Sequence, residues 1–98
     1  MSPHALLDRL KQRSHFVHGH RVVQDKDVAE LYGVSVKKLR GAVKRYLIRF
    51  PPDFLIEENN QFFFTEEGIL MVSSVIRNSR ATEVSLAIVR ELFGFNKN

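Results

Sequence analysis

The feature that most constrains the fold is an amphipathic segment between a glycine turn and a pair of prolines. Apolar residues recur at helical spacing from Leu39 to Phe50, which predicts a helix with one side in the core. The hydroxyl of Ser35 can cap the start of this helix, and Pro51-Pro52 predicts its end near Phe50. The side predicted to face the core consists of Leu39, Ala42, Val43, Tyr46, Leu47 and Phe50.

A shorter helix is predicted just before this segment, through Val28 and Tyr32. Asp25 is a suitable N-cap for it, and Gly33 supplies the left-handed backbone that commonly ends a helix. The small side chain of Ala29 allows two helices to cross closely. Two helices joined by such a turn have the outline of a helix-turn-helix.

The rest of the chain is predicted to form two hairpins and three further helices. Residues 16–24 suit a β-hairpin around Gly19, and strands at 54–56 and 62–64 flank a polar turn and would form a wing. The three helices are predicted from Ser2-Pro3 to near Arg13, from a Thr65 cap to Ile76, and from a Ser79 cap to Leu92.

These elements predict an α+β fold that is mostly helical: a helix-turn-helix with a small β-hairpin wing and C-terminal helices. The length suits one domain over residues 1–98, with an N-terminal helix extension at 1–14 and a core at 16–95. The run Phe62, Phe63 and Phe64 is expected to fill the core of this domain and not to form a stacking platform for single-stranded nucleic acid.

Positive charge is concentrated in residues 37–49, which contain no acidic residue. The net charge is +4, and the chain outside this segment has fewer Lys and Arg than Asp and Glu. A local basic stripe indicates a polyanionic partner more strongly than a diffuse positive charge does. The stripe consists of Lys37, Lys38, Arg40, Lys44, Arg45 and Arg49.

The position of each cation along the predicted helix suggests its role on duplex DNA. Side chains near the helix start can reach base edges in the major groove, and later ones meet phosphates. Gly41 lies among the cations and disfavours the helix, which the close approach of a ligand would justify. Asn59 and Asn60, at the wing tip, suit DNA contact and ordinary turn formation equally well. The predicted DNA-binding residues are Ser35 at the cap, Lys37, Lys38 and Arg40 at bases, Lys44, Arg45 and Arg49 at phosphates, Gly41 at a point of close approach, and Asn59 and Asn60 at the wing tip.

Other classes of protein are disfavoured. Without cysteine the chain has no thiolate metal site or disulfide, which fits the cytoplasm, and it has no apolar run of the roughly 20 residues that cross a membrane. His15, His18 and His20 lack a neighbouring carboxylate or thiol with ligand spacing, so solvated histidines are expected and not a metal site. No catalytic or nucleotide-binding motif is found, so no enzyme, cofactor or small-molecule substrate is expected.

From Gly19 onward the sequence resembles the KilA-N type of DNA-binding domain, and specifically its phage relative, the ORF-six N-terminal domain. The matching stretches are GHRVVQD at 19–25, VAELYGV at 28–34, AVKR at 42–45, RFP at 49–51 with DF at 53–54, FTEEG at 64–68, MVSSV at 71–75, Arg77 and SRA at 79–81. The resemblance implies a DNA-binding module of phages and prophages, often attached to antirepressor or other regulatory regions. Arg40 and Tyr46 depart from it, because relatives often carry asparagine there.

The leading hypothesis is therefore double-stranded DNA binding by a transcriptional regulator or antirepressor module of phage type. A homodimer would raise both affinity and specificity. The alternative is a protein-interaction domain whose basic helix docks an acidic partner and whose C-terminal helices mediate self-association. Binding to structured RNA is a third hypothesis.

Overall fold

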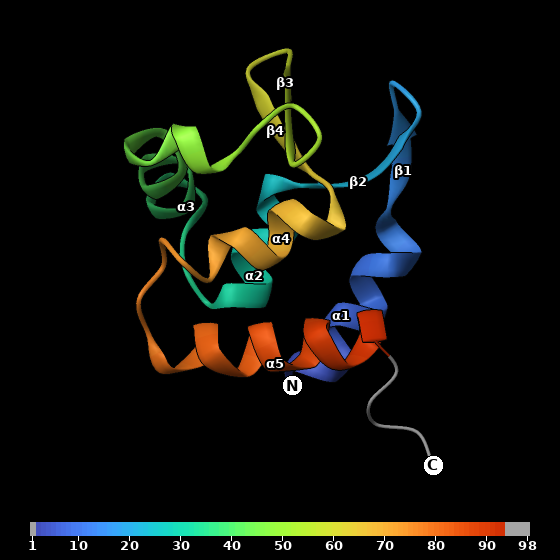
Figure 1. Cartoon of the computed structure of the whole chain (residues 1–98), viewed down its shortest axis with the longest axis vertical. Coiled ribbons are helices and arrows are strands. Elements are labelled where there is room, and N and C mark those ends of the chain that lie inside the picture. Colours follow the sequence, from blue (N-terminus) through green and yellow to red (C-terminus); the bar gives the residue numbers. More distant parts are fainter. Residues whose placement is uncertain (1, 94–98) are drawn as a thin grey trace.

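The computed structural model describes residues 2–93, so residues 1 and 94–98 of the predicted domain lie outside it. The described part is mostly helical and has a small antiparallel sheet, which confirms the predicted α+β class (Figure 1). The helices are α1 (Pro3–Arg13), α2 (Asp25–Tyr32), α3 (Val36–Arg45), the 3-10 helix η1 (Leu47–Arg49), α4 (Glu66–Val72) and α5 (Ser79–Phe93). The strands are β1 (His15–Val17), β2 (His20–Gln24), β3 (Leu55–Glu58) and β4 (Gln61–Phe64).

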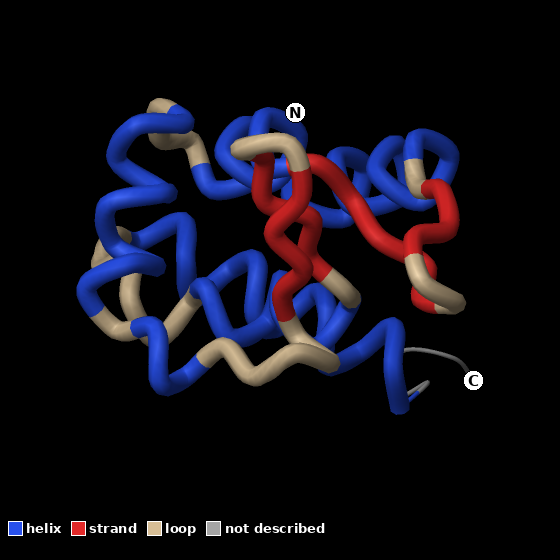
Figure 2. Tube along the Cα trace, turned by 90° about the horizontal axis from the view of Figure 1, so that it is seen from above, coloured by secondary structure: helices blue, strands red, loops and turns tan. Residues whose placement is uncertain are grey.

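Both predicted hairpins are present, and they join into one sheet in the order β1-β2-β4-β3. Figure 2 shows the strands as one band that extends from the β3–β4 hairpin to the β1–β2 hairpin. Each hairpin turns through two residues with positive φ, at 52° and 82° for His18 and Gly19 and at 55° and 63° for Asn59 and Asn60. Such backbone matches the right-handed twist of the paired strands. We call the β3–β4 hairpin the wing.

Three of the predicted helix caps are confirmed. The hydroxyls of Ser2, Ser35 and Thr65 each accept a hydrogen bond from the backbone N–H three residues later, at 3.2, 3.0 and 3.2 Å. Each bond satisfies a backbone donor that the first turn of a helix leaves without a partner. Gly33 ends α2 in the left-handed conformation, as predicted.

Two predicted caps are wrong. Asp25 lies inside the first turn of α2, after Gln24, whose side chain makes no capping bond. The carboxylate of Asp25 instead pairs with Arg40. At the start of α5 the side-chain oxygen of Asn78, and not Ser79, accepts the N–H of Ala81 at 2.8 Å.

The amphipathic helix α3 ends at Arg45, about one turn before the predicted end. Tyr46 leaves the helix with φ −122° and ψ 43°, and η1 follows it. Leu39, Val43 and Phe50 are buried as predicted, but Tyr46 and Leu47 are 40% and 54% exposed. A helix that continued through Phe50 would have turned both toward the core. Similarly, α4 ends at Val72 and not at Ile76, although Ile76 is still buried.

One core joins the elements. Leu6, Leu7 and Leu10 of α1 belong to it, and the fully buried Tyr32 lies in α2. Phe62, Phe63 and Phe64 are all buried, which confirms their predicted place in the core. Lys11 and Glu91 form an ion pair between α1 and α5, which lie together along the lower edge of Figure 1. Across residues 2–93 no helix combines the length and apolar character needed to cross a bilayer.

Candidate nucleic-acid interface

The outer side of α3 is the most basic surface that the sequence predicts, and it is open to solvent. Leu39 and Val43 are fully buried on the inner side, which fixes the rotation of the helix about its axis. The opposite side bears Lys37, Gly41 and Lys44, all exposed. The residues that line a shallow depression on this outer side are Val36, Lys37, Arg40, Gly41 and Lys44.

Within the part of the chain that the structure describes, four cations of this surface form no ion pair. Lys37, Lys38, Lys44 and Arg45 are exposed, and none forms an ion pair with a carboxylate anywhere in residues 2–93. Like charges this close on one helix repel each other by a few tenths of a kcal/mol per pair. We call these four residues the α3 cations. A polyanion placed against them would relieve this repulsion.

Arg40 differs from the α3 cations because its guanidinium is already paired. Its Nη1 lies 2.8 Å from Oδ2 of Asp25, and their side chains are 22% and 10% exposed. The same carboxylate oxygen accepts the N–H of Phe62 at 3.3 Å, and the guanidinium lies over the Phe62 ring at 4.4 Å. Arg40 therefore fastens α3 to the start of α2 and to β4.

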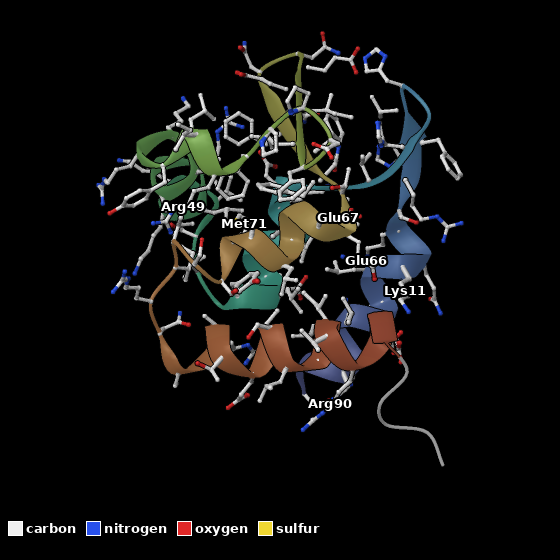
Figure 3. The ribbon with its side chains drawn as sticks, viewed as in Figure 1. Lys11, Arg49, Glu66, Glu67, Met71 and Arg90 are labelled. Atoms are coloured by element: carbon white, nitrogen blue, oxygen red, sulfur yellow. The ribbon has the colours of Figure 1, made fainter. Side chains whose placement is uncertain are left out.

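Arg49 is exposed but also held by the protein (Figure 3). Its Nη1 donates to the carbonyl oxygen of Ser74 at 3.1 Å, and its guanidinium lies 5.0 Å from the centre of the Tyr46 ring. These contacts hold η1 against the connection between α4 and α5. A guanidinium has five N–H donors, so others are left to meet a phosphate.

The wing does not share the positive charge of α3. Asn59 and Asn60 are exposed at its tip, beside the carboxylates of Glu57 and Glu58. The left-handed backbone of both asparagines shows that they form the turn, one of the two roles predicted for them. Contact of either asparagine with DNA stays a prediction.

The histidines of the β1–β2 hairpin contact other parts of the sheet. The His15 ring packs edge-on against Phe63, with centroids 5.6 Å apart, and Nε2 of His18 lies 3.6 Å from a carboxylate oxygen of Glu58. Among residues 2–93 no three His, Asp or Glu side chains cluster in a way that could hold a metal ion.

A separate cleft of about 540 Å³ lies between α1, β2 and the start of α4. Its lining mixes both signs of charge, because Lys11 and Arg21 contribute cations and Glu66, Glu67 and Glu91 contribute carboxylates. Figure 3 labels Lys11, Glu66 and Glu67 of this lining. Lys11 is already paired with Glu91. The cleft shares no lining residue with the depression on α3, so it is not part of the basic surface.

Sequence analysis missed three features of this region. It did not predict that α3 ends at Arg45, that Arg40 pairs with Asp25, or that Ile48 is 94% exposed. One signal for Ile48 was present. At 100° per residue it would fall opposite Leu39 even on a continuous helix, and therefore outside the core.

Comparison with known proteins supports part of the family resemblance. The model of the ORF6N domain matches residues 12–61, from the end of α1 through the wing turn and therefore across α2, α3 and η1. The match supports the resemblance to the ORF-six N-terminal domain but does not confirm the resemblance to KilA-N domains. The resembling stretches from residue 64 onward lie outside the matched residues. No curated protein and no solved structure matches the chain. Because the match spans just over half of the 98 residues, the chain belongs to the phage-associated ORF6N domain family.

Proposed function

We propose that this protein binds duplex DNA, with α2, its turn and α3 acting as a helix-turn-helix and α3 entering the major groove. The observation that carries the proposal is the set of α3 cations, which are exposed on one helix face and form no ion pair with a carboxylate of residues 2–93. Membership of a phage-associated family supports a regulatory setting. Kinship with KilA-N domains is part of the same proposal.

The structure suggests a division of roles along α3. Lys37 and Lys38 lie in its first turn, the end of a recognition helix that usually reaches base edges. Lys44 and Arg45 lie in the last turn and are placed to meet phosphates, together with Arg49. Arg40 is assigned to holding the orientation of α3, because its guanidinium is already bound to Asp25.

The depression around Gly41 would let DNA come close to the backbone of α3. A Cβ built on Gly41 would have no neighbour within 4 Å, so internal packing does not require glycine there. Glycine within a helix costs about 0.5–1 kcal/mol relative to alanine. An external partner that comes against the backbone between Lys37 and Lys44 would explain why the position has no side chain.

In this proposal the protein is a binding module, not an enzyme, within a phage-type transcriptional regulator or antirepressor. A homodimer would place two copies of α3 on half-sites about 34–36 Å apart, or on multiples of that spacing. Sedimentation with and without duplex measures whether two copies assemble.

The test is selection of preferred duplexes from a random pool, followed by affinity measurements across salt concentrations. The three phosphate contacts proposed for Lys44, Arg45 and Arg49 would make log K fall with log salt at a slope of about −3. The double variant Lys44→Ala/Arg45→Ala should weaken binding to all sequences and flatten the slope by about 2, whereas Lys38→Ala should relax sequence preference.

Arg90→Ala is the matched control, since it removes an exposed cation from α5, away from α3 (Figure 3). It should leave affinity and salt slope nearly unchanged. A wild-type protein that shows no preference among duplexes would refute sequence-specific DNA binding. A stronger affinity for structured RNA than for duplex DNA would favour the RNA hypothesis instead.

A further inference from the structure

Immediately after α3 the chain presents an exposed apolar tip, residues 46–48. Tyr46, Leu47 and Ile48 are 40%, 54% and 94% exposed. Single apolar side chains on a surface are ordinary, but three in succession that leave the core indicate a binding surface. The α3 cations do not account for this surface.

The apolar tip is held firmly at both ends. The N–H of Tyr46 donates to the carbonyls of the last α3 turn, and the N–H of Arg49 donates to the carbonyl of Tyr46 at 2.9 Å. Phe50 is buried directly behind the tip and packs edge-on against Phe64. The guanidinium of Arg49, directly after the apolar tip, donates a hydrogen bond to the carbonyl oxygen of Ser74. Ile48 is therefore presented on an ordered support, which lowers the entropy cost of binding.

Charge identifies the kind of partner. Lys44, Arg45 and Arg49 flank the apolar tip, and no acidic residue lies between Glu30 and Asp53 in the sequence. A symmetric contact between two copies would bring these cations against their own equivalents, which electrostatic repulsion disfavours. An anionic partner with an apolar interior fits better. Duplex DNA, with charged phosphates outside stacked bases, has this character, and the tip is continuous with α3.

We propose that the apolar tip docks on the same duplex as α3, with Ile48 acting as a wedge at a base step in the adjacent minor groove. This inference rests on the proposed function. Aliphatic side chains inserted between base pairs unstack them and kink the duplex toward the major groove. The flanking cations bind phosphates on either side. Pyrimidine–purine steps unstack most readily, so the preferred duplexes should carry one beside the α3 site.

The test compares the wild type with Ile48→Ala on a selected duplex that carries 2-aminopurine at the flanking step and a dye pair at its ends. Wild-type binding should raise 2-aminopurine fluorescence and shorten the end-to-end distance. Ile48→Ala should lose both signals and bind about tenfold more weakly. Its salt slope should not change, because no charge is removed.

Two further variants separate the wedge from general effects. Leu86→Ala removes a 47% exposed leucine from α5 and should behave like the wild type in every measurement. Ile48→Leu should retain the fluorescence and bending signals. Equal thermal unfolding midpoints for the wild type and Ile48→Ala show that the fold is intact.

The outcomes are distinguishable. If Ile48→Ala binds, unstacks and bends DNA as the wild type does, the wedge is overturned and the proposed function stands. If the wild type binds no duplex, both are overturned. Sedimentation of the free protein is a third check: a dimer that Ile48→Ala disrupts would assign the apolar tip to self-association and overturn its docking on DNA.

Discussion

Gly41 and Gly68 both lie inside helices, and their surroundings are opposite. A Cβ on Gly41 would point into open space on the outer side of α3. A Cβ on Gly68 would lie 2.0 Å from the carbonyl oxygen of Phe54, because the chain before β3 packs directly on the first turn of α4. One glycine is required by the fold, and the other is not.

Replacing Gly41 by alanine should therefore separate stability from binding. We expect Gly41→Ala to raise the free energy of unfolding by about 0.5–1 kcal/mol, the helix propensity difference. If DNA comes close to the α3 backbone at Gly41, the added methyl group should obstruct it, and the same variant should bind DNA more weakly. Chemical denaturation and duplex affinity measure the two effects. A variant that is stabilised and binds as well as the wild type would refute close approach at this position.

Gly68→Ala provides the contrasting result. Its Cβ cannot be accommodated unless the backbone of Phe54 moves away from α4. We expect the free energy of unfolding to fall by about 1–3 kcal/mol, the usual cost of overpacking. Chemical denaturation under the conditions used for Gly41→Ala checks this, and an unchanged or higher stability would contradict the packing described for α4.

At the scale of elements, the Asp25–Arg40 pair sets how α3 lies on the rest of the fold. It connects the start of α2, the middle of α3 and the N–H of Phe62 in β4 through one carboxylate oxygen. The low exposure of both side chains means that removing either one leaves a charge poorly solvated. The pair is therefore expected to position the α3 cations, although it contributes none of them.

A double-mutant cycle tests this role. Asp25→Asn alone should lower the free energy of unfolding by about 1–3 kcal/mol, and the coupling to Arg40→Gln should exceed about 1 kcal/mol. The pair Lys11–Glu91, whose side chains are more exposed at 45% and 27%, serves as the control, with an expected coupling of about 0–1 kcal/mol. In DNA binding Asp25→Asn should lower affinity without reducing the salt slope. Equal couplings for the two pairs would contradict a positioning role for Arg40.

The elements that the sequence predicted correctly are those with local signals. Three helices begin after a Ser or Thr that precedes apolar residues at helical spacing, and Gly33 ends α2. Each hairpin turns at residues that readily adopt positive φ, Gly19 in one and Asn59 and Asn60 in the other. Features that depend on distant contacts could not be predicted. The pairing of Val23 with Phe64, which joins the two hairpins, depends on residues about 40 positions apart.

The end of α3 was mispredicted because apolar spacing continues past it. Tyr46, Leu47 and Phe50 fit a helical period, yet only Phe50 reaches the core. The chain leaves the helix at Tyr46, and Arg49 then binds the carbonyl of Ser74, a contact that local sequence does not reveal. Of the predicted site, the exposure of the α3 cations could be inferred from helix periodicity. The pairing of Arg40 could not.

At the scale of the whole molecule, Tyr32 places a polar hydroxyl inside the core. It is fully buried, and its hydroxyl donates to the carbonyl oxygen of Ile69 in α4 at 2.6 Å. Its own carbonyl accepts from the Asn78 side chain at 3.4 Å, before α5. Tyr32 thus links α2 to both C-terminal helices. Burial raises the pKa of the Tyr32 hydroxyl above its ordinary value, because the core disfavours the phenolate.

This shift predicts how stability depends on pH. A raised pKa in the folded state means that the unfolded chain loses the Tyr32 proton first, so stability is complete below about pH 10 and falls above it, by up to about 1.4 kcal/mol per pH unit. The ion pair with Glu91 raises the pKa of Lys11, which acts in the same direction. Lys11 is exposed, and it is retained in the variants compared below.

Tyr32→Phe should remove the contribution of this hydroxyl to the alkaline loss. At neutral pH the variant should be less stable by about 1–2 kcal/mol, because the Ile69 carbonyl loses its buried donor. Above pH 10 the difference from the wild type should shrink, since only the wild type loses stability through ionisation of this group. Tyr46→Phe, at a 40% exposed position, is the control and should follow the wild-type profile. Denaturation curves between pH 7 and 11 measure the difference in the free energy of unfolding between Tyr32→Phe and the wild type. A difference that stays constant over this range would show that ionisation of Tyr32 does not contribute to the loss of stability at high pH.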